Sequence, residues 1–270
     1  METNSLVTLL TDFGQQDGYV GVIKGVILSL APQTTLVDLT HAVPPQDVLT
    51  GAWMLHISWR YFPEGTIILA VVDPGVGSTR RAVAFHVANR TFVGPDNGLF
   101  SYVLAASTPE RAVALDNPKY QLPQPSATFH GRDIFAPAVG NLAAGVALSQ
   151  LGTSLEPSNL VRLPLPRAEW RAGVLVAHVL HIDGFGNAIL DVDPAQTDEI
   201  LRNSAVEALV GWRRITQHVR TFGEGPANEC ALLRDSSGHL AIILRDGSAA
   251  QMLHLRRGDE VRITGLRSPV

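Results

Sequence analysis

The chain has 270 residues, enough for two hydrophobic cores, and its 46% hydrophobic and 17% charged residues are typical of a globular enzyme, not of a disordered chain. A net charge of -4 leaves no basic surface for nucleic acid or anionic lipid, so we expect neither as a partner. The N-terminus lacks the basic and apolar regions of a signal peptide, and no apolar run approaches membrane-spanning length, which predicts a cytoplasmic protein.

Strands and helices alternate through the first half of the chain. Apolar runs and apolar residues at helical spacing predict, in chain order, a strand at 6–10, a helix at 19–30, a strand at 35–39, a helix at 47–62, strands at 66–72 and 81–88, a turn at 94–98, and helices at 99–105 and 134–145. This order predicts an α/β domain over residues 1–163, whose mostly parallel sheet is flanked by helices.

The pattern changes after a proline-punctuated linker at 163–167. Short runs typical of strands follow at 174–182, 188–192, 207–212, 215–220, 231–234, 240–244 and 260–264, and only 194–203 has a helical pattern. Asp235-Ser-Ser-Gly238 is a hairpin turn signal between two of these runs. We therefore expect a smaller C-terminal domain over residues 172–270, an antiparallel β-barrel or sandwich.

Two aspartates stand at the ends of predicted parallel strands. Asp12 and Asp73 should therefore lie at the same edge of the sheet, where open α/β sheets place their sites. Asp73 begins a Pro/Gly turn, and Arg80 follows seven residues later. The segment 75–80 imitates a dinucleotide fingerprint, but its third glycine is missing and a strand follows it, so that interpretation fails. A plain turn is the simpler alternative.

Two further segments carry polar residues in suggestive places. His130 lies in a polar stretch just before a predicted helix, where its imidazole would be accessible, although an isolated histidine is more often structural. At 182–187 a strand is broken by glycines around Phe185, beside Asp183 and Asn187. This segment is either a β-bulge or a ring-stacking face with an amide and a carboxylate, which would suit a purine and a charged group.

A metal-dependent hydrolase is an alternative from these residues. Asp12, Asp73, Asp133 and His130 could supply oxygen and nitrogen ligands for Mg²⁺ or Mn²⁺. Arg80 and Arg132 would then place positive charge beside the cation, which argues against that site. The single cysteine, Cys230, allows no cysteine metal cluster and is predicted to be a core residue.

Five motifs in order give the chain a resemblance to a known family over nearly its whole length; they lie at 11–25, 71–80, 94–100, 129–137 and 183–187. The chain resembles the S-adenosylmethionine hydrolases (hydroxide adenosyltransferases), relatives of the fluorinase and chlorinase. The resemblance implies an N-terminal α/β domain, a C-terminal β-barrel and a homotrimer with its sites between subunits. It also implies an enzyme without metal or cofactor, in which a water-derived hydroxide attacks the ribose C5′ of S-adenosyl-L-methionine and releases adenosine and L-methionine.

The resemblance also implies residue roles. The hydrolases carry a catalytic triad that maps onto Asp73, Arg80 and His130, whereas the halogenases have aromatic residues at the positions matching Asp73 and His130, and another near Gln46. Intact, the triad also argues against a third alternative, a non-catalytic adenosine-binding protein. The substrate-binding positions are Asp12 for the ribose hydroxyls, Asp17 and Asp183 for the methionine amine, Phe185 and Asn187 for adenine, and further Ser237, Asp246 and Gly247. Many relatives have asparagine where this chain has Arg245.

Overall fold

The computed structural model describes residues 5–267 and divides into two compact units, unit 1 (Met1–Pro164) and unit 2 (Leu165–Val270). Each unit has a hydrophobic core of its own. Among the described residues, no helix combines the length and the apolar character needed to cross a bilayer.

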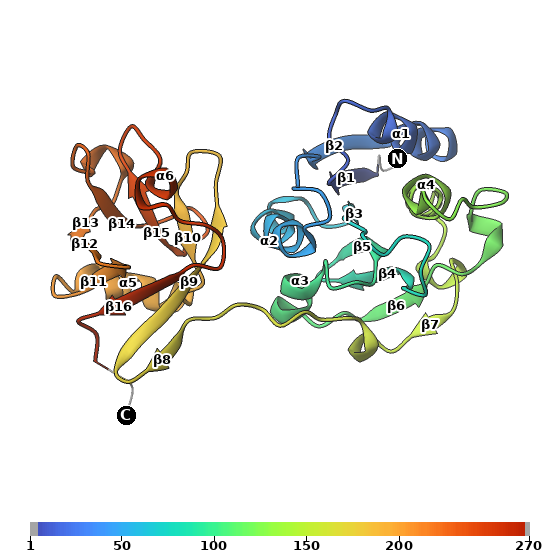
Figure 1. Ribbon diagram of the computed structural model, residues 1–270. Helices are drawn as coiled ribbons and strands as arrows, with labels where there is room; N and C mark the ends of the chain where they lie inside the picture. The colour runs from blue at the N-terminus through green and yellow to red at the C-terminus, as the bar shows by residue number, and fades with distance from the viewer. Residues whose placement is uncertain (1–4, 268–270) are drawn as a thin grey trace. The chain divides into compact units, whose positions relative to one another are not determined.

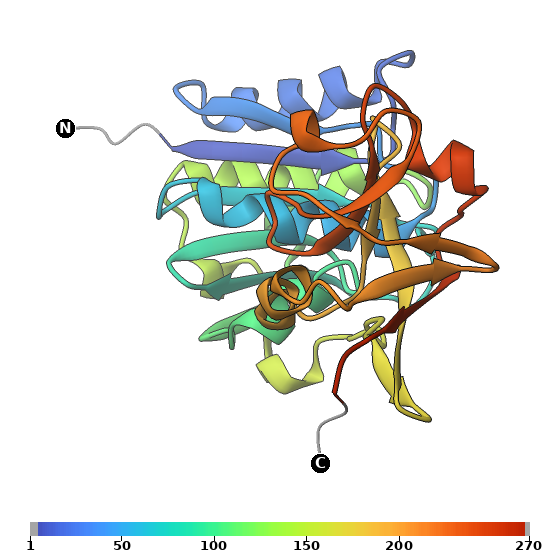
Figure 2. The same ribbon diagram turned by 90° about the vertical axis from the view of Figure 1, so that its left-hand side faces the viewer.

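Unit 1 contains a mixed sheet in the order β2-β1-β3-β5-β4-β6-β7. Its strands are β1 (Leu6–Thr11), β2 (Thr35–Thr40), β3 (Ile67–Val71), β4 (Ala82–Val87), β5 (Arg90–Pro95), β6 (Arg111–Ala114) and β7 (Ser154–Leu155). The pairings from β2 to β5 are parallel, and those from β5 to β7 are antiparallel. Figure 2 shows β1 and β2 side by side at the start of the chain. The predicted α/β class is confirmed, with the parallel pairings confined to one half of the sheet.

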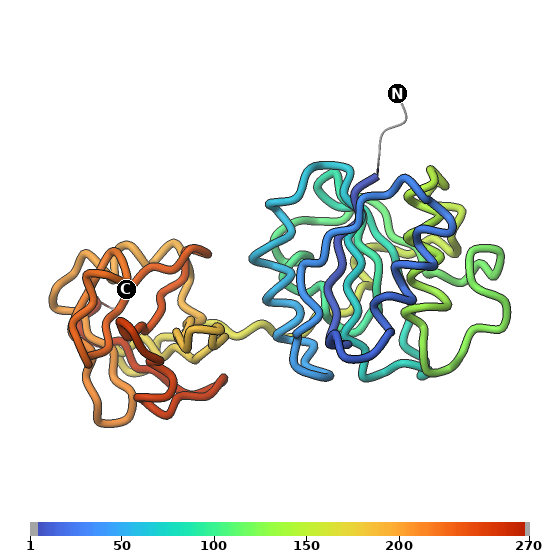
Figure 3. The backbone as a smooth tube through the Cα atoms, turned by 90° about the horizontal axis from the view of Figure 1, so that it is seen from above, coloured from blue at the N-terminus to red at the C-terminus, as the bar shows by residue number. Residues whose placement is uncertain are grey.

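Helices cover both faces of this sheet (Figures 1 and 3). Helices α1 (Tyr19–Leu30) and α4 (Ala136–Ala143) pack over one face, and α2 (Val48–Ser58) and α3 (Ser101–Ala106) over the other. Successive residues of a strand point to opposite faces, so Leu9 lies in the core under α1 while Leu10 lies in the core under α2. Asp47 caps α2 by accepting a hydrogen bond from the Thr50 N–H at 3.0 Å.

Three predicted elements of unit 1 need correction. Strand β5 was not predicted, because its hairpin turn uses Ala88 and Asn89 with positive φ (47° and 57°) instead of the glycine that usually signals such a turn. The predicted turn at 94–98 therefore overlaps the end of this strand. The helix expected over 47–62 ends at Ser58 and is followed by a 3₁₀ turn at Trp59–Tyr61. The helix expected from residue 134 begins earlier, with a π-helical turn at Gly131–Phe135.

Unit 2 is built on an antiparallel-rich sheet in the order β12-β11-β16-β9-β10-β15-β14-β13, with β8 also paired to β9. Its strands are β8 (Glu169–Arg171), β9 (Val174–Ile182), β10 (Ala188–Leu190), β11 (Glu207–Val210), β12 (Arg213–Ile215), β13 (Gln217–His218), β14 (Cys230–Arg234), β15 (Leu240–Leu244) and β16 (Glu260–Thr264). The end strands β12 and β13 are separated in the chain by Thr216 alone, so the sheet curls back on itself. The predicted barrel-like domain is confirmed.

Two helices accompany this sheet, α5 (Pro194–Arg202) and α6 (Ala249–Leu253). Helix α5 was predicted, but α6 was not, since five residues are too few for a helical periodicity to show. The run expected at 215–220 is split between β12 and β13. Cys230 is 8% exposed and its thiol contacts the Met252 sulfur at 3.7 Å, as expected of a core residue.

Candidate active site

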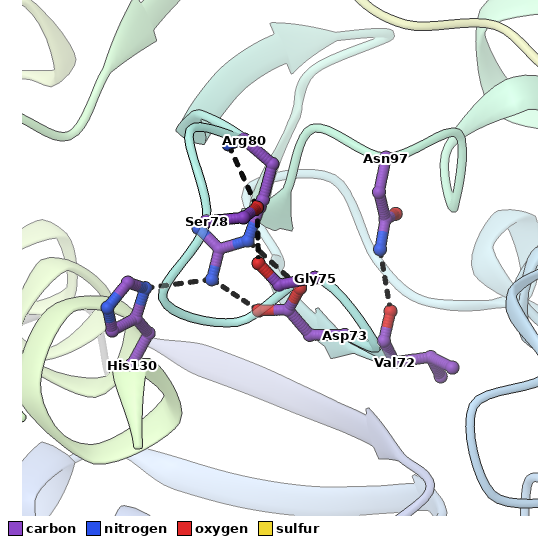
Figure 4. A network of polar contacts seen from close by, with 7 residues as sticks. All are labelled: Val72, Asp73, Gly75, Ser78, Arg80, Asn97 and His130. Atoms are coloured by element: carbon purple, nitrogen blue, oxygen red, sulfur yellow. Dashed lines mark hydrogen bonds and ion pairs between the residues drawn. The ribbon is translucent and has the colours of Figure 1, made fainter. Parts of the chain in front are cut away.

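Asp73, Arg80 and His130 meet at the edge of the unit 1 sheet (Figure 4). Asp73 follows the end of β3, and Arg80 leads into β4. The Arg80 guanidinium contacts both Asp73 oxygens, with Nε donating to Oδ1 at 2.9 Å and Nη2 to Oδ2. The same Nη2 donates to Nδ1 of His130 at 2.8 Å. Arg80 therefore joins a carboxylate and an imidazole that are 57 residues apart in the sequence.

Two members of the trio, Arg80 and Asp73, are largely buried. The Arg80 and Asp73 side chains are 9% and 5% exposed, and the guanidinium lies over the Phe135 ring at 5.3 Å. A bidentate, desolvated pair of this kind fixes the geometry of both partners. An arginine N–H can only donate, so Nδ1 of His130 must accept, and the proton of the neutral imidazole lies on Nε2.

The charge state of His130 follows from its surroundings. Burial lowers the pKa of His130 below its usual range, and the nearby Arg80 cation lowers it further; Asp73 and Asp133 act in the opposite direction without reversing the effect. The imidazole is therefore neutral near pH 7, with its Nδ1 lone pair available to Arg80.

The loop between Asp73 and Arg80 is held by its own hydrogen bonds. Val76 N–H donates to the Asp73 carbonyl at 3.2 Å, and the Ser78 hydroxyl donates to the Gly75 carbonyl at 2.6 Å. Gly77 has φ +78°, and its Cα lies so close to the Ala127 carbonyl that a Cβ would overlap it. This close approach packs the loop carrying Asp73 against the segment that leads to His130.

Asp133 stabilises the segment that carries His130. It is 1% exposed, pairs with Arg132 through Nε–Oδ1 at 2.6 Å, and accepts the Ser126 N–H at 2.8 Å. The hydrogen bond from Arg132 holds the pKa of Asp133 below its usual range against the opposing effect of burial. Asp133 thus has structural partners on both oxygens, and in the described part of the chain no group of three or more His, Cys, Asp or Glu side chains is arranged to hold a metal ion.

The trio borders a cavity of about 640 Å³ in unit 1. Asp73 and His130 line it, but Arg80 does not; Arg80 lies behind them. Asp12 lines the cavity from the end of β1 and accepts the Gln46 N–H at 2.8 Å, while Asp17 is exposed and lies outside the lining. Aromatic rings that the sequence did not assign to the site, Phe13, Tyr19 and Phe129, form one wall with centroids 5.2–6.1 Å apart.

Unit 2 has a cavity of its own, of about 750 Å³. Its lining includes the expected Asp183, Phe185, Asn187, Asp246 and Gly247, together with Arg245. The Asp183 carboxylate organises the turn: it accepts the N–H groups of Phe185 and Asn187, both at 2.9 Å, and the Asn187 side-chain amide at 2.8 Å. Phe185 is 83% exposed, so its ring is free to stack on a ligand.

Two positions in this cavity differ from expectation. Ser237 is not in the lining, because its hydroxyl is bonded to Asp235 at 2.7 Å and to Nδ1 of His239 at 3.0 Å; its neighbour Ser236 lines the cavity instead. Phe222, 52% exposed, also lines the cavity. No motif marks Phe222, which stands between Thr221 and Gly223 and begins a 3₁₀ turn.

Comparison with known proteins adds to this geometry. Residues 7–152 match the SAM hydroxide adenosyltransferase N-terminal domain, and residues 177–262 match the corresponding C-terminal domain. The (R)-S-adenosyl-L-methionine hydrolase of Salinispora arenicola is 39% identical over 98% of this chain and 99% of its own, and that of Thermus thermophilus is 42% identical over 95% and 98%. A solved structure of an uncharacterized conserved protein from Thermotoga maritima superimposes with a TM-score of 0.87 at 32% identity, covering 95% of this chain and 99% of that one.

Proposed function

Because this chain belongs to the SAM hydroxide adenosyltransferase family, we propose that it hydrolyses S-adenosyl-L-methionine to adenosine and L-methionine, with Asp73, Arg80 and His130 as its catalytic residues. The observation that carries the assignment of these residues is the Arg80 guanidinium, which binds Asp73 and His130 together at the cavity edge.

The reaction needs a strong nucleophile and no acid for the leaving group. Methionine leaves the sulfonium as a neutral thioether, so the sulfur takes the C5′–S electron pair without protonation. The difficult step is to activate water near neutral pH and to hold it in line with that bond. A desolvated, preorganised polar site is suited to this task.

The hydrogen-bond directions divide the work among the trio. His130 presents its Nε2–H, a donor, so it orients the water through the water oxygen. Asp73 lines the cavity and has lone pairs beyond those used by Arg80, so it accepts the proton as the water oxygen bonds to C5′. Arg80 stays charged throughout, and its positive charge stabilises the negative charge that develops on the attacking oxygen as the water loses its proton.

We assign the substrate-binding roles from the resemblance, and the lining of the two cavities supports most of them. In unit 1, Asp12 accepts the ribose hydroxyls with the lone pairs that Gln46 leaves free. In unit 2, Phe185 stacks on adenine, Asn187 and the backbone near Asp246 and Gly247 bind its edge, and Asp183 binds the methionine amine. We propose that the exposed Asp17 binds the methionine amine together with Asp183, and that Ser237 holds the turn that bears Ser236.

For the whole protein we propose a cytoplasmic homotrimer that binds S-adenosyl-L-methionine and has no nucleic-acid or membrane partner. The net charge of -4 supports the last two points. In this assembly the unit 1 cavity of one subunit and the unit 2 cavity of a neighbouring subunit serve the same substrate.

The activity is tested with purified protein treated with EDTA and incubated with S-adenosyl-L-methionine in chloride-containing buffer. Chromatography should show adenosine and methionine in equal amounts, with no 5′-chloro-adenosine or methylthioadenosine. Activity lost with EDTA and restored by a divalent ion would overturn the assignment of the trio in favour of a metal-dependent hydrolase. Adenosine binding without turnover would instead favour a non-catalytic protein.

A further inference from the structure

The loops that follow β1 and β2 are joined behind the Asp12 carboxylate. Gly14 N–H donates to the His41 carbonyl at 2.8 Å, and Val43 N–H approaches the Thr11 carbonyl at 3.4 Å. Gln46, whose φ is +66°, donates its backbone N–H to Asp12 Oδ2 at 2.8 Å. The position of Asp12 therefore depends on how the two loops are held together.

A buried side-chain pair lies at the centre of this junction. Thr11, fully buried, and His41, 3% exposed, are joined through Oγ1 and Nδ1 at 2.8 Å. The Thr11 oxygen also accepts the Phe13 N–H at 3.2 Å, which ties it to the residue directly after Asp12. On its other side, Nε2 of His41 lies 3.0 Å from Asp38 Oδ1, and Asp38 Oδ2 lies 2.7 Å from the Lys24 ammonium.

These contacts form a chain with one consistent direction of donation. Asp38 is a carboxylate that only accepts, and its Oδ1 lies 3.0 Å from Nε2 of His41, which favours the tautomer with the proton on Nε2 and the lone pair on Nδ1. The Thr11 hydroxyl then donates to Nδ1, and its oxygen is free to accept from Phe13. Hydrogen bonds from Lys24 and His41 keep the pKa of Asp38 below its usual range, although burial acts to raise it. Each member of the chain fixes the orientation of the next.

We propose that Thr11 and His41 are positioning residues for Asp12, and that their hydrogen bond sets the affinity of the enzyme for the ribose hydroxyls of its substrate. This inference rests on the proposed function, in which Asp12 binds that diol. Neither side chain lines the cavity. Both act through the Asp12–Gly14 turn: the Thr11 hydroxyl holds it by accepting the Phe13 N–H, and the His41 side chain fixes the residue whose backbone carbonyl accepts the Gly14 N–H.

The first test is calorimetry with adenosine on variants of Thr11. Thr11→Val keeps the shape of the side chain and removes the hydroxyl. We expect adenosine binding to weaken about tenfold, because a displaced Asp12 carboxylate would make a weaker hydrogen bond to the ribose. Thr11→Ser keeps the hydroxyl and should bind close to the parent value. Thr8→Val is the matched control, because Thr8 is 1% exposed on the same strand and outside the cavity; it should leave affinity unchanged whatever it does to stability.

The second test separates the two nitrogens of His41. Asparagine can place its amide oxygen near the position of Nδ1, whereas glutamine can place its amide near Nε2. His41→Asn should therefore retain adenosine affinity better than His41→Gln. With S-adenosyl-L-methionine, Thr11→Val and His41→Gln should raise KM more than they lower kcat.

Measuring Asp12→Ala in the same experiment separates a failure of the positioning role from a failure of the proposed function. If Asp12→Ala weakens adenosine binding while Thr11→Val and His41→Gln bind like the parent, the positioning role is wrong and the proposed function stands. If Asp12→Ala itself binds adenosine normally, the ribose assignment in the proposed function is wrong. Equal losses in Thr11→Val and Thr8→Val would also overturn the inference, since they would show a general effect on the strand.

Discussion

Arg80 is the residue on which the candidate site depends. It contacts Asp73 and His130 at once but does not line the cavity, so it acts on the reaction through its charge and through the two side chains that it holds. Asp12 has the opposite character, since it faces the cavity and has no bond to the trio. The two residues should therefore affect different kinetic constants.

We expect Arg80→Ala to lower kcat about 10²–10³-fold, the usual loss for one preorganised electrostatic contact, and to leave adenosine affinity nearly intact. Arg80→Lys keeps the charge without the planar fork and should fall between the parent and Arg80→Ala. Asp12→Ala should mainly weaken adenosine binding, because the ribose is held in ground and transition states alike. Calorimetry and steady-state kinetics on the three variants check this. Loss of adenosine binding in Arg80→Ala with normal binding in Asp12→Ala would reverse the two roles.

Protonation of His130 should lower kcat at acidic pH. Because its pKa lies below the usual value of about 6.5, the neutral form persists at neutral pH and is lost only as the pH falls through that lowered pKa. Protonation places an N–H on Nδ1, facing Arg80, and breaks their hydrogen bond. We expect kcat to fall on the acid side with a midpoint below about 6.5. The stability that neutral His130 contributes above its unfolded-state pKa should be lost over the same range.

His130→Asn is the control for this pH effect. Its amide oxygen can still accept from Arg80, but it cannot titrate and has no Nε2–H. The variant should be slow at every pH, and the acid limb assigned to His130 should disappear from its kcat profile. An unchanged acid limb in His130→Asn would assign the titration to another group.

At the residue scale, the sequence predicted which residues form the trio, and most of the predicted binding residues line the two cavities, but it did not predict how their side chains are arranged. Asp73 follows β3, and Arg80 precedes β4, which runs antiparallel to β5 and therefore begins at the edge where β3 and β5 end. Motifs do not predict three details. Arg80 is not in the lining of the unit 1 cavity, Ser236 replaces Ser237 in the lining of the unit 2 cavity, and Phe222 also lines that second cavity. Each depends on side-chain directions set by tertiary packing.

At the scale of elements, the site depends on the contact between two loops. Gly77 makes this contact against Ala127, three residues before His130. The elements themselves were predictable where apolar periodicity was long, as in α1 and β9. They were missed where a turn had unusual chemistry, as at Ala88 and Asn89, or where a helix was very short, as in α6.

Gly77→Ala should damage the site through this contact. The new Cβ would meet the Ala127 carbonyl and would also carry a positive φ, so the segment bearing His130 must move. Gly145→Ala is the matched control, since Gly145 has φ +92° in the same unit and a Cβ added there would have nothing within 4 Å. Both should lose about 1–2 kcal/mol of unfolding free energy from the positive φ, and Gly77→Ala about 1–3 kcal/mol more from overpacking.

Urea unfolding and kcat measurements on both glycine variants test this explanation. Gly77→Ala should lose activity well beyond its loss of stability, and Gly145→Ala should remain active. Equal stability and full activity in the two variants would show that the loop contact does not position His130.

At the scale of the whole molecule, each unit has its own core and its own cavity. The fold class was predictable because strand and helix patterns change character along the chain. Assembly is different, since the sequence pattern records which residues are apolar but not which copy they contact. The proposed trimer therefore rests on the resemblance, and on the proposal that ribose and adenine contact residues of different units.

Light scattering should give three times the chain mass of 29.0 kDa, as expected of a heterologous interface that closes into a ring. Mixed assemblies of Arg80→Ala and Phe185→Ala test whether neighbours share sites. Phe185 is 83% exposed, so its truncation should not disturb folding. If a site combines unit 1 and unit 2 of different subunits, mixing two weak variants should restore part of the activity. A fully active monomer, or no recovery on mixing, would contradict the shared site.

The pairing of Arg80 with Asp73 has a consequence for which small molecule can attack. With His130 neutral, the formal charges of the trio cancel, so the buried cation is already compensated. A halide entering such an electroneutral site would give up its hydration shell without gaining an unpaired positive charge, which is an unfavourable exchange. Water enters uncharged and finds a donor and an acceptor in place. In the proposed mechanism the trio therefore disfavours a halide as the nucleophile, because the dehydrated anion finds no uncompensated positive charge there.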